Sequence, residues 1–236
     1  MTIYLAASEM ISVVIPVLNE ARVLETTLER LAANPYPREV IVVDGGSTDR
    51  SVEIARAAGA RVIKSDRSQR AAQMNLGAAQ ARGGAVVFLH ADTELSPTAL
   101  QAVALTLQDD HVVGGGFYRR FGSRLPALKL TCRMADWRNR LIGWHLGDQA
   151  IFARRKVFQE MGGYRDIDLF EDLDFSRRLA RHGRVVTLRP AVVSSARRFE
   201  RRGAWRTTMS DFWLTARYYF GADPNRLAAD LRAARA

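Results

Sequence analysis

The residues best suited to chemistry follow a short apolar run, where two side chains with metal-binding or hydrogen-bonding atoms stand one residue apart. Residues 86–89 are Val-Val-Phe-Leu, and His90 and Asp92 come shortly after them. Alternation along a strand would point His90 and Asp92 to the same side. In open parallel α/β sheets, ligands bind beyond the carboxyl ends of the strands, which makes Asp92 a candidate ligand-binding residue. Alternatively, both residues belong to the cap of a helix expected to begin near Ser96 and Pro97.

A second carboxylate stands at the end of another predicted strand. Residues 40–43 are apolar and lead into Asp-Gly-Gly-Ser-Thr-Asp at 44–49. The two glycines allow the backbone to approach a ligand closely. Ser47 or Thr48 can cap the next helix, whose N-terminus favours a phosphate. The alternative is an ordinary Asp-Gly turn. The segment is neither the Gly-x-Gly-x-x-Gly dinucleotide fingerprint nor a P-loop.

A third carboxylate, Asp172, falls on the apolar face of a predicted helix. At about 100° per residue, Glu171 and Asp174 lie on the opposite, arginine-bearing side. A buried carboxylate is costly unless it is capped, paired or functional. The alternative role for Asp172 is a first-turn residue favoured by the helix dipole. We expect Glu171 and Asp174 to be solvated partners of Arg177 and Arg178.

Strand–helix alternation supplies the elements that would position these carboxylates. Apolar runs at 11–15, 40–43, 61–63 and 86–89 alternate with helical patterns at 19–31, 52–58 and 70–81. Such alternation requires crossover helices and therefore a largely parallel sheet. The expected inward residues of the first two helices are Leu24, Leu28 and Leu31, then Val52, Ala55 and Ala58.

Composition limits the class of protein. The chain has 236 residues, of which 47% are hydrophobic and 25% charged, which suits one large domain or a domain with an appendage. A single cysteine, Cys132, excludes an internal disulfide and fits a reducing compartment. We expect a cytoplasmic protein, because there is no long apolar span and no basic secretory leader. The net charge of +10 favours an anionic partner: a nucleotide, a phospholipid surface or nucleic acid.

Two amphipathic stretches in the second half carry aromatic residues at helical spacing, interleaved with or preceded by arginines. They are Leu130, Met134, Trp137, Leu141 and Trp144, and then Trp205, Met209, Phe212, Ala216, Tyr219 and Phe220. One interpretation is that both lie on an anionic bilayer and meet a lipid-linked acceptor. The other is that they pack on the sheet or form a dimer seam.

Taken in order, six motifs resemble those of family 2 glycosyltransferases. They are Ile15-Pro16 with Asn19-Glu20, Asp44 to Asp49, Arg70 with Asn75 and Gly77, His90-Ala91-Asp92, Gly147-Asp148-Gln149, and Glu171-Asp172. The similarity covers roughly Ile11 to Arg189. The spellings Asp-Gly-Gly-Ser and His-Ala-Asp-Thr are similar to the compact subgroup associated with arsenosugar biosynthesis and radical-SAM enzymes.

The resemblance implies a GT-A fold, an α/β arrangement with a mostly parallel, helix-flanked sheet, to which the spacing of the aromatic residues adds C-terminal amphipathic helices. It implies transfer of a sugar, with inversion, from a nucleotide diphosphate donor to a hydroxyl. Asp92 would hold Mg²⁺ or Mn²⁺ against the diphosphate, and Asp172 would be the general base. Donor binding is implied for Pro16, Asn19, Glu20, Asp44, Gly45, Gly46, Ser47, Arg70, His90, Ala91 and Asp92. Acceptor-side roles are implied for Gly147, Asp148, Gln149 and Glu171.

Two residues depart from the family pattern. Gly45 replaces the second Asp of the usual Asp-Asp-Gly-Ser, and His90 replaces the first Asp of the metal motif. With His90 there, a cation would rely on Asp92, phosphate oxygens and water, and His90 would instead hydrogen-bond the ribose or diphosphate. The implied division is an N-terminal extension at 1–10, a donor half at 11–108, an acceptor and catalytic half at 109–195 and a helical appendage at 196–236.

Alternatives from other classes remain. A nucleotidyltransferase is disfavoured because no Gly-rich loop bearing Arg or Lys follows the first strand. A non-catalytic basic module is disfavoured because no nucleic-acid motif is present and the aromatic residues lie in helical stripes rather than on a stacking sheet. Polymer-forming family members carry Gln-x-x-Arg-Trp and membrane helices. This chain has only Arg-Arg-Gly-Ala-Trp at 201–205, so we expect non-processive transfer.

Overall fold

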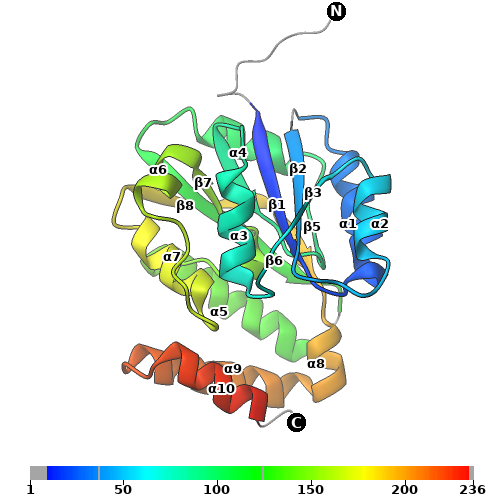
Figure 1. Ribbon diagram of the computed structural model, residues 1–236. Helices are drawn as coiled ribbons and strands as arrows, with labels where there is room; N and C mark the ends of the chain where they lie inside the picture. The colour runs from blue at the N-terminus through cyan, green and yellow to red at the C-terminus, as the bar shows by residue number, and fades with distance from the viewer. Residues whose placement is uncertain (1–9, 37, 124, 234–236) are drawn as a thin grey trace, which may run out of the picture.

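An eight-stranded sheet forms the centre of the computed structural model, which describes residues 10–36, 38–123 and 125–233 (Figure 1). The predicted extension at 1–10 lies outside the described residues except for Met10. Across the sheet the strand order is β3-β2-β1-β4-β7-β6-β8-β5. In chain order the strands are β1 (Ile11–Val17), β2 (Arg38–Asp44), β3 (Arg61–Lys64), β4 (Ala85–Phe88), β5 (Thr93–Glu94), β6 (Val112–Phe121), β7 (Phe152–Arg154) and β8 (Arg184–Ser194).

Helices cover both faces of the sheet and the end at which β1 and β2 terminate (Figure 1). They are α1 (Ala21–Ala32), α2 (Ser51–Ala57), α3 (Arg70–Ala79), α4 (Ala99–Thr106), α5 (Pro126–Ile142), α6 (Arg155–Glu160), α7 (Glu171–Leu179), α8 (Arg197–Arg202), α9 (Ala204–Tyr219) and α10 (Pro224–Ala233), with a 3₁₀ helix η1 (Gly147–Gln149).

The first half of the sheet is parallel, as the strand–helix alternation predicts. β1 pairs in parallel with both β2 and β4, and β3 pairs in parallel with β2. The second half is mixed, because β7 runs antiparallel to β4 and β6, and β5 runs antiparallel to β8. The register sets Val17 beside Asp44, so the loops that follow β1 and β2 leave the sheet at the same edge.

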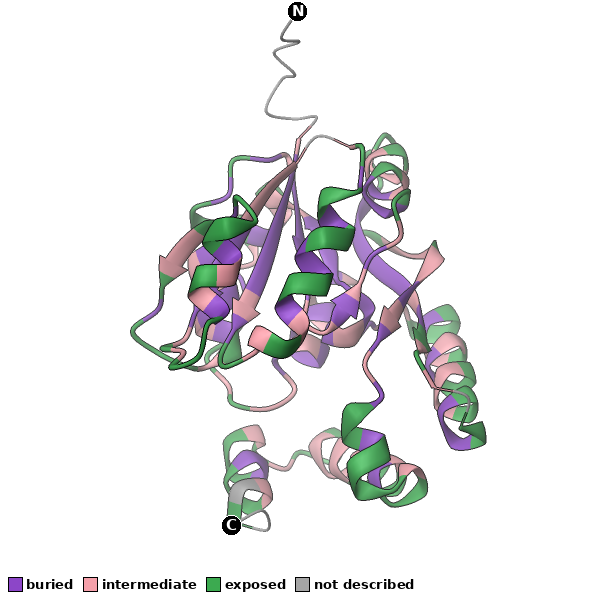
Figure 2. Ribbon diagram, turned by 90° about the vertical axis from the view of Figure 1, so that its right-hand side faces the viewer, coloured by how far each residue is buried: buried purple, intermediate pink, exposed green. Residues whose placement is uncertain are grey.

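Two apolar layers hold the sheet, one on each face, and Figure 2 shows the strands buried between exposed helix surfaces. Alternation decides which layer a strand residue joins: Val13 packs with α1 and α4, whereas Val14 packs with α3. The second layer continues through aromatic rings into α7. Phe88 of β4 meets Tyr164 edge to face at 4.9 Å, and Tyr164 stacks on Phe175 of α7 at 4.4 Å. The start of α7 is thereby fixed beside the end of β4.

Two local expectations were wrong, and one helix begins slightly later than expected. The helix expected near Ser96 and Pro97 begins at Ala99, because residues 97 and 98 form a turn. Ala58 is exposed, because α2 ends at Ala57 and the chain then turns towards β3. Neither Ser47 nor Thr48 caps α2; instead an Asp49 carboxylate oxygen accepts a hydrogen bond from the Ser51 N–H at 2.9 Å.

The C-terminal helices lie at the end of the molecule where β1 and β2 terminate (Figure 1). α9 contacts α5 on one side and α10 on another. Leu128, near the start of α5, packs with Phe199 of α8 and with Ala204, the first residue of α9. Near their other ends, Trp144 and Tyr219 meet with ring centroids 5.5 Å apart. α5 and α9 therefore run side by side in the same direction. Within the described ranges, no helix combines the length and apolar character needed to cross a lipid bilayer.

Candidate active site

The loops after β1 and β2 are joined by hydrogen bonds. The Asn19 N–H donates to the Ser47 hydroxyl at 2.9 Å, and the Thr48 N–H donates to the Asn19 side-chain oxygen at 2.8 Å. Asn19 has φ 56°, a left-handed conformation that Asn tolerates better than most residues. The Glu20 N–H donates to the Ser51 hydroxyl at 2.9 Å. The residues predicted from both loops to bind the donor thus form one continuous wall.

Asp44 organises its own loop. It is buried at the end of β2, and its carboxylate accepts hydrogen bonds from the N–H groups of Gly46 at 3.1 Å and Ser47 at 3.0 Å. Gly46 has φ 98°, a conformation that favours glycine. The carboxylate therefore holds the Gly-Gly-Ser backbone in the shape that a nearby ligand would meet.

Gln73 supports the same loop and was not singled out from the sequence. From α3 its amide donates to the carbonyl oxygens of Val17 at 2.9 Å and Val43 at 2.8 Å. A Cβ on Gly45 would lie 3.0 Å from the Gln73 amide nitrogen. Gly45 is therefore a position with little room for a side chain.

His90 and Asp92 lie in the turn that follows β4 rather than in the strand itself, and their side chains have different partners. β4 ends before His90, and the Thr93 N–H donates to the His90 carbonyl at 3.0 Å, which closes a turn. Asp92 Oδ2 lies 3.4 Å from Arg197 Nη2, and Glu20 Oε2 lies 3.3 Å from the same nitrogen. Arg197, which the sequence pattern did not identify, thus joins two predicted donor-binding carboxylates.

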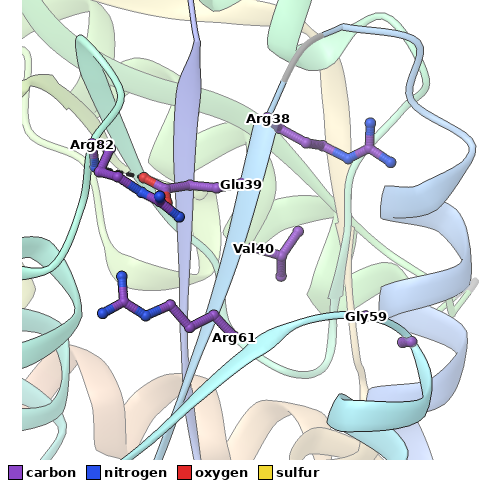
Figure 3. Close-up of a pocket in the computed structure, with 7 residues that line it drawn as sticks. Arg38, Glu39, Val40, Gly59, Arg61 and Arg82 are labelled. Atoms are coloured by element: carbon purple, nitrogen blue, oxygen red, sulfur yellow. Dashed lines mark hydrogen bonds and ion pairs between the residues drawn. The ribbon is translucent and has the colours of Figure 1, made fainter. Parts of the chain in front are cut away.

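A hollow of about 300 Å³ lies beside Asp92 and Arg197. A second hollow, of about 360 Å³, lies at the opposite, amino-terminal ends of β2 and β3 (Figure 3). There Arg82 Nε lies 3.1 Å from a Glu39 carboxylate oxygen, and Arg61 points towards the same opening. Of these two hollows, only the one beside Arg197 is lined by a residue of the six motifs, Asp92.

Asp172 meets Gly147 and His90 at the start of α7. The Gly147 N–H donates to Asp172 Oδ2 at 2.7 Å, and the Leu173 N–H is 2.7 Å from Asp172 Oδ1. A Cβ on Gly147 would lie 2.5 Å from His90 Nε2 and 3.3 Å from Asp172 Oδ2, so all three residues converge. Burial, and then the neighbouring Glu171 charge, raise the pKa of Asp172 to about 6. Such a carboxylate suits proton transfer near neutral pH.

His90 is neutral in this environment. Burial, followed by the charge of Arg70, lowers the pKa of His90 to about 3. A neutral imidazole offers one hydrogen-bond donor and one acceptor. The arrangement fits polar contact with a ligand and does not make His90 a cation near pH 7.

The expectation that Glu171 and Asp174 are solvated was wrong, since both are buried, whereas Asp172 is half-buried. Glu171 lies 3.2 Å from Arg70 of α3, because α3 packs against the start of α7. Asp174 does pair with Arg178, at 2.7 Å. Packing against α3 therefore overrides the side assigned to Glu171 by helical periodicity, and Asp174 is enclosed between Arg165 and Arg178.

The Gly147-Asp148-Gln149 segment is held from both sides. The fully buried Gln149 amide donates to the Phe117 carbonyl at 2.9 Å, and its oxygen accepts from Arg138 at 2.7 Å. Asp148 forms an ion pair with buried Arg119 of β6. Burial opposes ionisation of Asp148, but the Arg119 guanidinium outweighs it and lowers the pKa of that carboxyl.

The remaining motif residues, Pro16, Asn75, Gly77 and Ala91, hold the strands, helices and loops around the site in place. The Ala91 carbonyl accepts a hydrogen bond from the Thr27 hydroxyl at 2.7 Å, and Pro16 is half-buried in β1. Asn75 exchanges two 2.8 Å hydrogen bonds with the Tyr164 backbone. A Cβ on Gly77 would lie 2.4 Å from a Val14 methyl, so this glycine allows α3 to approach β1 closely.

Several buried polar atoms on η1 and on elements that pack around it lack a hydrogen-bond partner among the described residues. Five of them come from α5, β6, η1 and α9: Arg119 Nε, Asp136 Oδ1, Asn139 Nδ2, Asp148 Oδ1 and Thr207 Oγ1. Buried polar groups are normally satisfied by protein, water or ligand. This side of the site therefore has unused capacity for hydroxyl groups or water.

The C-terminal helix α9 reaches the site as well. Tyr218 stacks on Phe170, the residue before α7, with ring centroids 4.9 Å apart. Asp211 forms an ion pair with Arg198 of α8. Because Phe170 has φ 65°, the turn into α7 is in an uncommon conformation, and Tyr218 packs directly against it. The spacing of aromatic residues alone gave no signal for this contact.

Few protein oxygens are available to a divalent cation. Within the described ranges, no group of three or more His, Cys, Asp or Glu side chains is arranged to hold a metal ion. Asp92 is partly exposed, and Glu20 reaches the same arginine. Mg²⁺ in phosphate sites commonly takes one or two carboxylates together with phosphate oxygens and water. The residues therefore fit a cation bound together with a diphosphate.

Comparison with known proteins identifies the family. The model described as "Glycosyl transferase family 2" matches residues 12–171. A PGL/p-HBAD biosynthesis glycosyltransferase of Mycobacterium tuberculosis is 32% identical over 194 residues, covering 77% of this chain and 73% of the relative. Glycosyltransferase GlyG of Streptococcus pneumoniae is 32% identical over 120 residues, 47% of this chain and 40% of that protein.

Solved structures share the fold at low identity. TarS residues 1–349 of S. aureus in complex with UDP-GlcNAc match with a TM-score of 0.62 and 19% identity, over 79% of this chain and 58% of that chain. Mannosyltransferase PcManGT of Pyrobaculum calidifontis, in complex with GDP-Man and Mn²⁺, matches with a TM-score of 0.62 and 21% identity, over 78% of this chain and 56% of that chain. The chain spans only 36% of the longer TarS structure. Together with the family match, these similarities show that the chain belongs to glycosyl transferase family 2 and is a glycosyltransferase with the GT-A fold.

Proposed function

We propose that this glycosyltransferase moves a sugar from a nucleoside diphosphate donor to an acceptor hydroxyl, with inversion and with Asp172 as the general base. The observation that carries the proposal is the convergence of Asp172, Gly147 and His90 at the start of α7, where the pKa of Asp172 is raised to about 6. A carboxylate with this pKa is ionised near pH 7 and still basic enough to take a hydroxyl proton in the transition state.

In the proposed step, the acceptor oxygen attacks the anomeric carbon of the donor sugar. The new carbon–oxygen bond forms as the bond from that carbon to the diphosphate breaks, and the nucleoside diphosphate leaves with the bonding electrons. Asp172 takes the hydroxyl proton. Gly147 orients the carboxylate through its N–H. A single displacement of this kind inverts the anomeric configuration.

The donor is proposed to lie along the wall made by the loops after β1 and β2. Asn19, Asp44 and Ser47 fix that wall at the carboxyl edge of the parallel strands, where α/β sheets bind ligands. Proteins of the same fold are known with UDP-GlcNAc and with GDP-Man. These complexes support a nucleotide sugar as the donor class for this chain.

A divalent cation is proposed to bind with the donor, held by Asp92, phosphate oxygens and water. When bound, it would offset the negative charge that builds on the departing diphosphate. Mn²⁺ is present in the PcManGT complex. Two arginines lie beside carboxylates of the proposed site: Arg197 contacts Asp92, and Arg70 pairs with Glu171.

The acceptor is proposed to approach from the side of η1, α5 and α9, where five buried polar atoms lack partners among the described residues. In this division, residues 11–108 serve the donor, 109–195 the acceptor and catalysis, and 196–236 form an appendage. A lipid-linked acceptor, a cytoplasmic location and membership of the arsenosugar-associated subgroup stay predictions from the sequence.

The first test is a thermal-shift panel of UDP, GDP, CDP and dTDP, each with and without Mn²⁺. A ligand that binds only the native state raises the apparent melting temperature. We expect one diphosphate to produce a selective shift that Mn²⁺ enlarges and that Asp92→Ala removes, with Asp110→Ala as an exposed carboxylate control. The absence of a shift with every diphosphate would contradict the proposed donor class. A shift that Mn²⁺ leaves unchanged would retain the donor and reject the cation.

A further inference from the structure

Large apolar side chains are exposed almost entirely on two neighbouring helices. Among the described residues, all strongly exposed large apolar side chains except Leu18 and Leu105 lie in segments 125–142 and 205–220. They include Trp137, 69% exposed, on α5 and Trp213, 65% exposed, on α9. Concentrated apolar exposure of this kind marks an interaction site. The full set is Leu125, Leu130, Met134, Trp137, Leu141, Ile142, Trp205, Met209, Phe212, Trp213, Tyr219 and Phe220, and we call this set the apolar face.

The two parts of the apolar face belong to one surface. α5 and α9 run side by side in the same direction, joined near their ends by the Leu128 cluster and by the Trp144–Tyr219 contact. On each helix the exposed apolar residues lie opposite the buried ones, such as Ala135 on α5 and Thr207 on α9. Each helix is about 25 Å long, so the face is wide enough for a partner that is itself a surface.

Positive charge accompanies the apolar face. Exposed basic residues stand beside it on α5, at the end of α8 and on α9: Lys129, Arg133, Arg140, Arg201, Arg202 and Arg206. α5 and α9 contain one carboxylate each, Asp136 and Asp211; Asp136 is half-buried, and Asp211 is already paired with Arg198. A second copy of the chain placed against this face would bring like charges together without exposed, unpaired carboxylates from these helices to offset them.

We propose that the apolar face docks on the surface of an anionic lipid bilayer. Amphipathic helices with aromatic residues on one side and arginine or lysine beside them lie in the plane of a membrane interface. Tryptophan is favoured there because its ring is apolar and its N–H is polar. Neither helix is long and apolar enough to cross a bilayer, so the helices lie along it.

Docking in this way also orients the site. Tyr218 of α9 stacks on Phe170, which directly precedes Glu171 and Asp172. The lipid-facing helices therefore lie next to the proposed base and, on this proposal, form part of the acceptor side. The proposal itself needs no donor or acceptor and can be tested without either.

The four tryptophans of the chain provide a built-in reporter, because all of them, Trp137, Trp144, Trp205 and Trp213, lie in or beside the apolar face. Vesicles of phosphatidylcholine alone are compared with vesicles of phosphatidylcholine mixed with phosphatidylglycerol. We expect co-flotation and a blue shift of tryptophan emission with the mixed vesicles, and little of either with the neutral ones.

Paired variants test the apolar and basic parts separately. We expect Trp137→Ser with Trp213→Ser, and in another protein Arg201→Gln with Arg206→Gln, to weaken vesicle binding about tenfold each. The matched controls are Leu105→Ser on α4 and Arg56→Gln on α2, both exposed and away from the apolar face, and these should bind like the unmodified protein. Because the substituted side chains are exposed, circular dichroism should be unchanged in all four.

Three outcomes would overturn the proposal. The first is no binding of the unmodified protein to either kind of vesicle. The second is full binding by the tryptophan variant, because vesicle binding would then be explained by the net charge of the protein and not by the apolar face. The third is a dimer in sedimentation equilibrium that the tryptophan variant loses, which would assign the face to a second copy of the chain. None of these outcomes bears on donor binding, which the diphosphate panel measures independently.

Discussion

The amide nitrogen of Gly147 lies 2.7 Å from Oδ2 of Asp172 and donates a hydrogen bond to it. Gly147 belongs to η1 and Asp172 to α7, and the two residues are 25 positions apart in the chain. The bond fixes the direction of a carboxylate that is only half-buried, and the absence of a side chain on Gly147 leaves room for His90 beside it. The proposed chemistry depends on this junction.

Asp172→Asn should abolish transfer and leave donor binding nearly intact, because asparagine keeps the shape but cannot take a proton. It should also remove the part of the pH dependence of stability that comes from Asp172. The native pKa of Asp172 is about 6, above the ordinary value of 3.8. Ionisation therefore costs more in the native state than in the unfolded chain, and this cost is fully present above about pH 6 and disappears below about pH 4. Melting temperatures at both ends of this range, together with diphosphate binding, check the prediction. Loss of donor binding, or a melting temperature that changes with pH in the variant as it does in the unmodified protein, would count against it.

The activity of the unmodified protein should fall as the pH drops through about 6, as Asp172 becomes protonated. His90, with a pKa of about 3, should not contribute to this limb, since it stays neutral throughout the range. The measurement is kcat/KM against pH for the free enzyme, with melting temperature followed over the same range to exclude unfolding. A flat profile down to pH 5 would remove Asp172 as the base.

Gly147→Ala should lower kcat strongly, because the new Cβ would lie 2.5 Å from His90 Nε2 and force His90 or η1 to move. We expect a loss of about 1–3 kcal/mol in the free energy of unfolding as well, which is typical of a side chain forced into a packed site. Gly122→Ala is the matched control, since its Cβ would meet nothing nearer than 3.9 Å. Chemical denaturation and initial rates give both quantities. Equal rates in the two variants would show that the convergence at Gly147 is unimportant.

Arg197→Gln should increase the affinity for Mn²⁺ measured without nucleotide. The guanidinium lies 3.3 Å from Glu20 and 3.4 Å from Asp92, so it competes with a metal ion for both carboxylates. Removing it leaves two carboxylates without that cation, and their mutual repulsion favours a divalent ion. Titration calorimetry with Mn²⁺ is the measurement, and Arg202→Gln, an exposed change on the same helix, is the control. Unchanged Mn²⁺ affinity would place the metal away from Asp92.

Much of the wall proposed to bind the donor could be predicted from the sequence, because its signals are local. Apolar runs that end in Asp44 and lead to His90 and Asp92 follow directly from strand periodicity, and the parallel pairing of β1, β2 and β4 follows from crossover helices between them. The glycines after Asp44 likewise predict a turn that places backbone close to a ligand. In each case the residues that define the feature are neighbours in the chain.

The remaining features depend on residues that are distant in the chain. Arg197 reaches Asp92 over 105 positions, and Arg70 reaches Glu171 over 101, so no periodicity could have paired them. For the same reason helical spacing assigned Glu171 to solvent, whereas packing of α3 buries it. The sequence by itself determined the motifs, the strand–helix order and the amphipathic stripes, because these reflect neighbouring residues. The tertiary structure decided which carboxylates are buried, how Gly147, His90 and Asp172 meet, and that the apolar stripes of α5 and α9 face outward, because each depends on which surfaces the folded chain brings into contact.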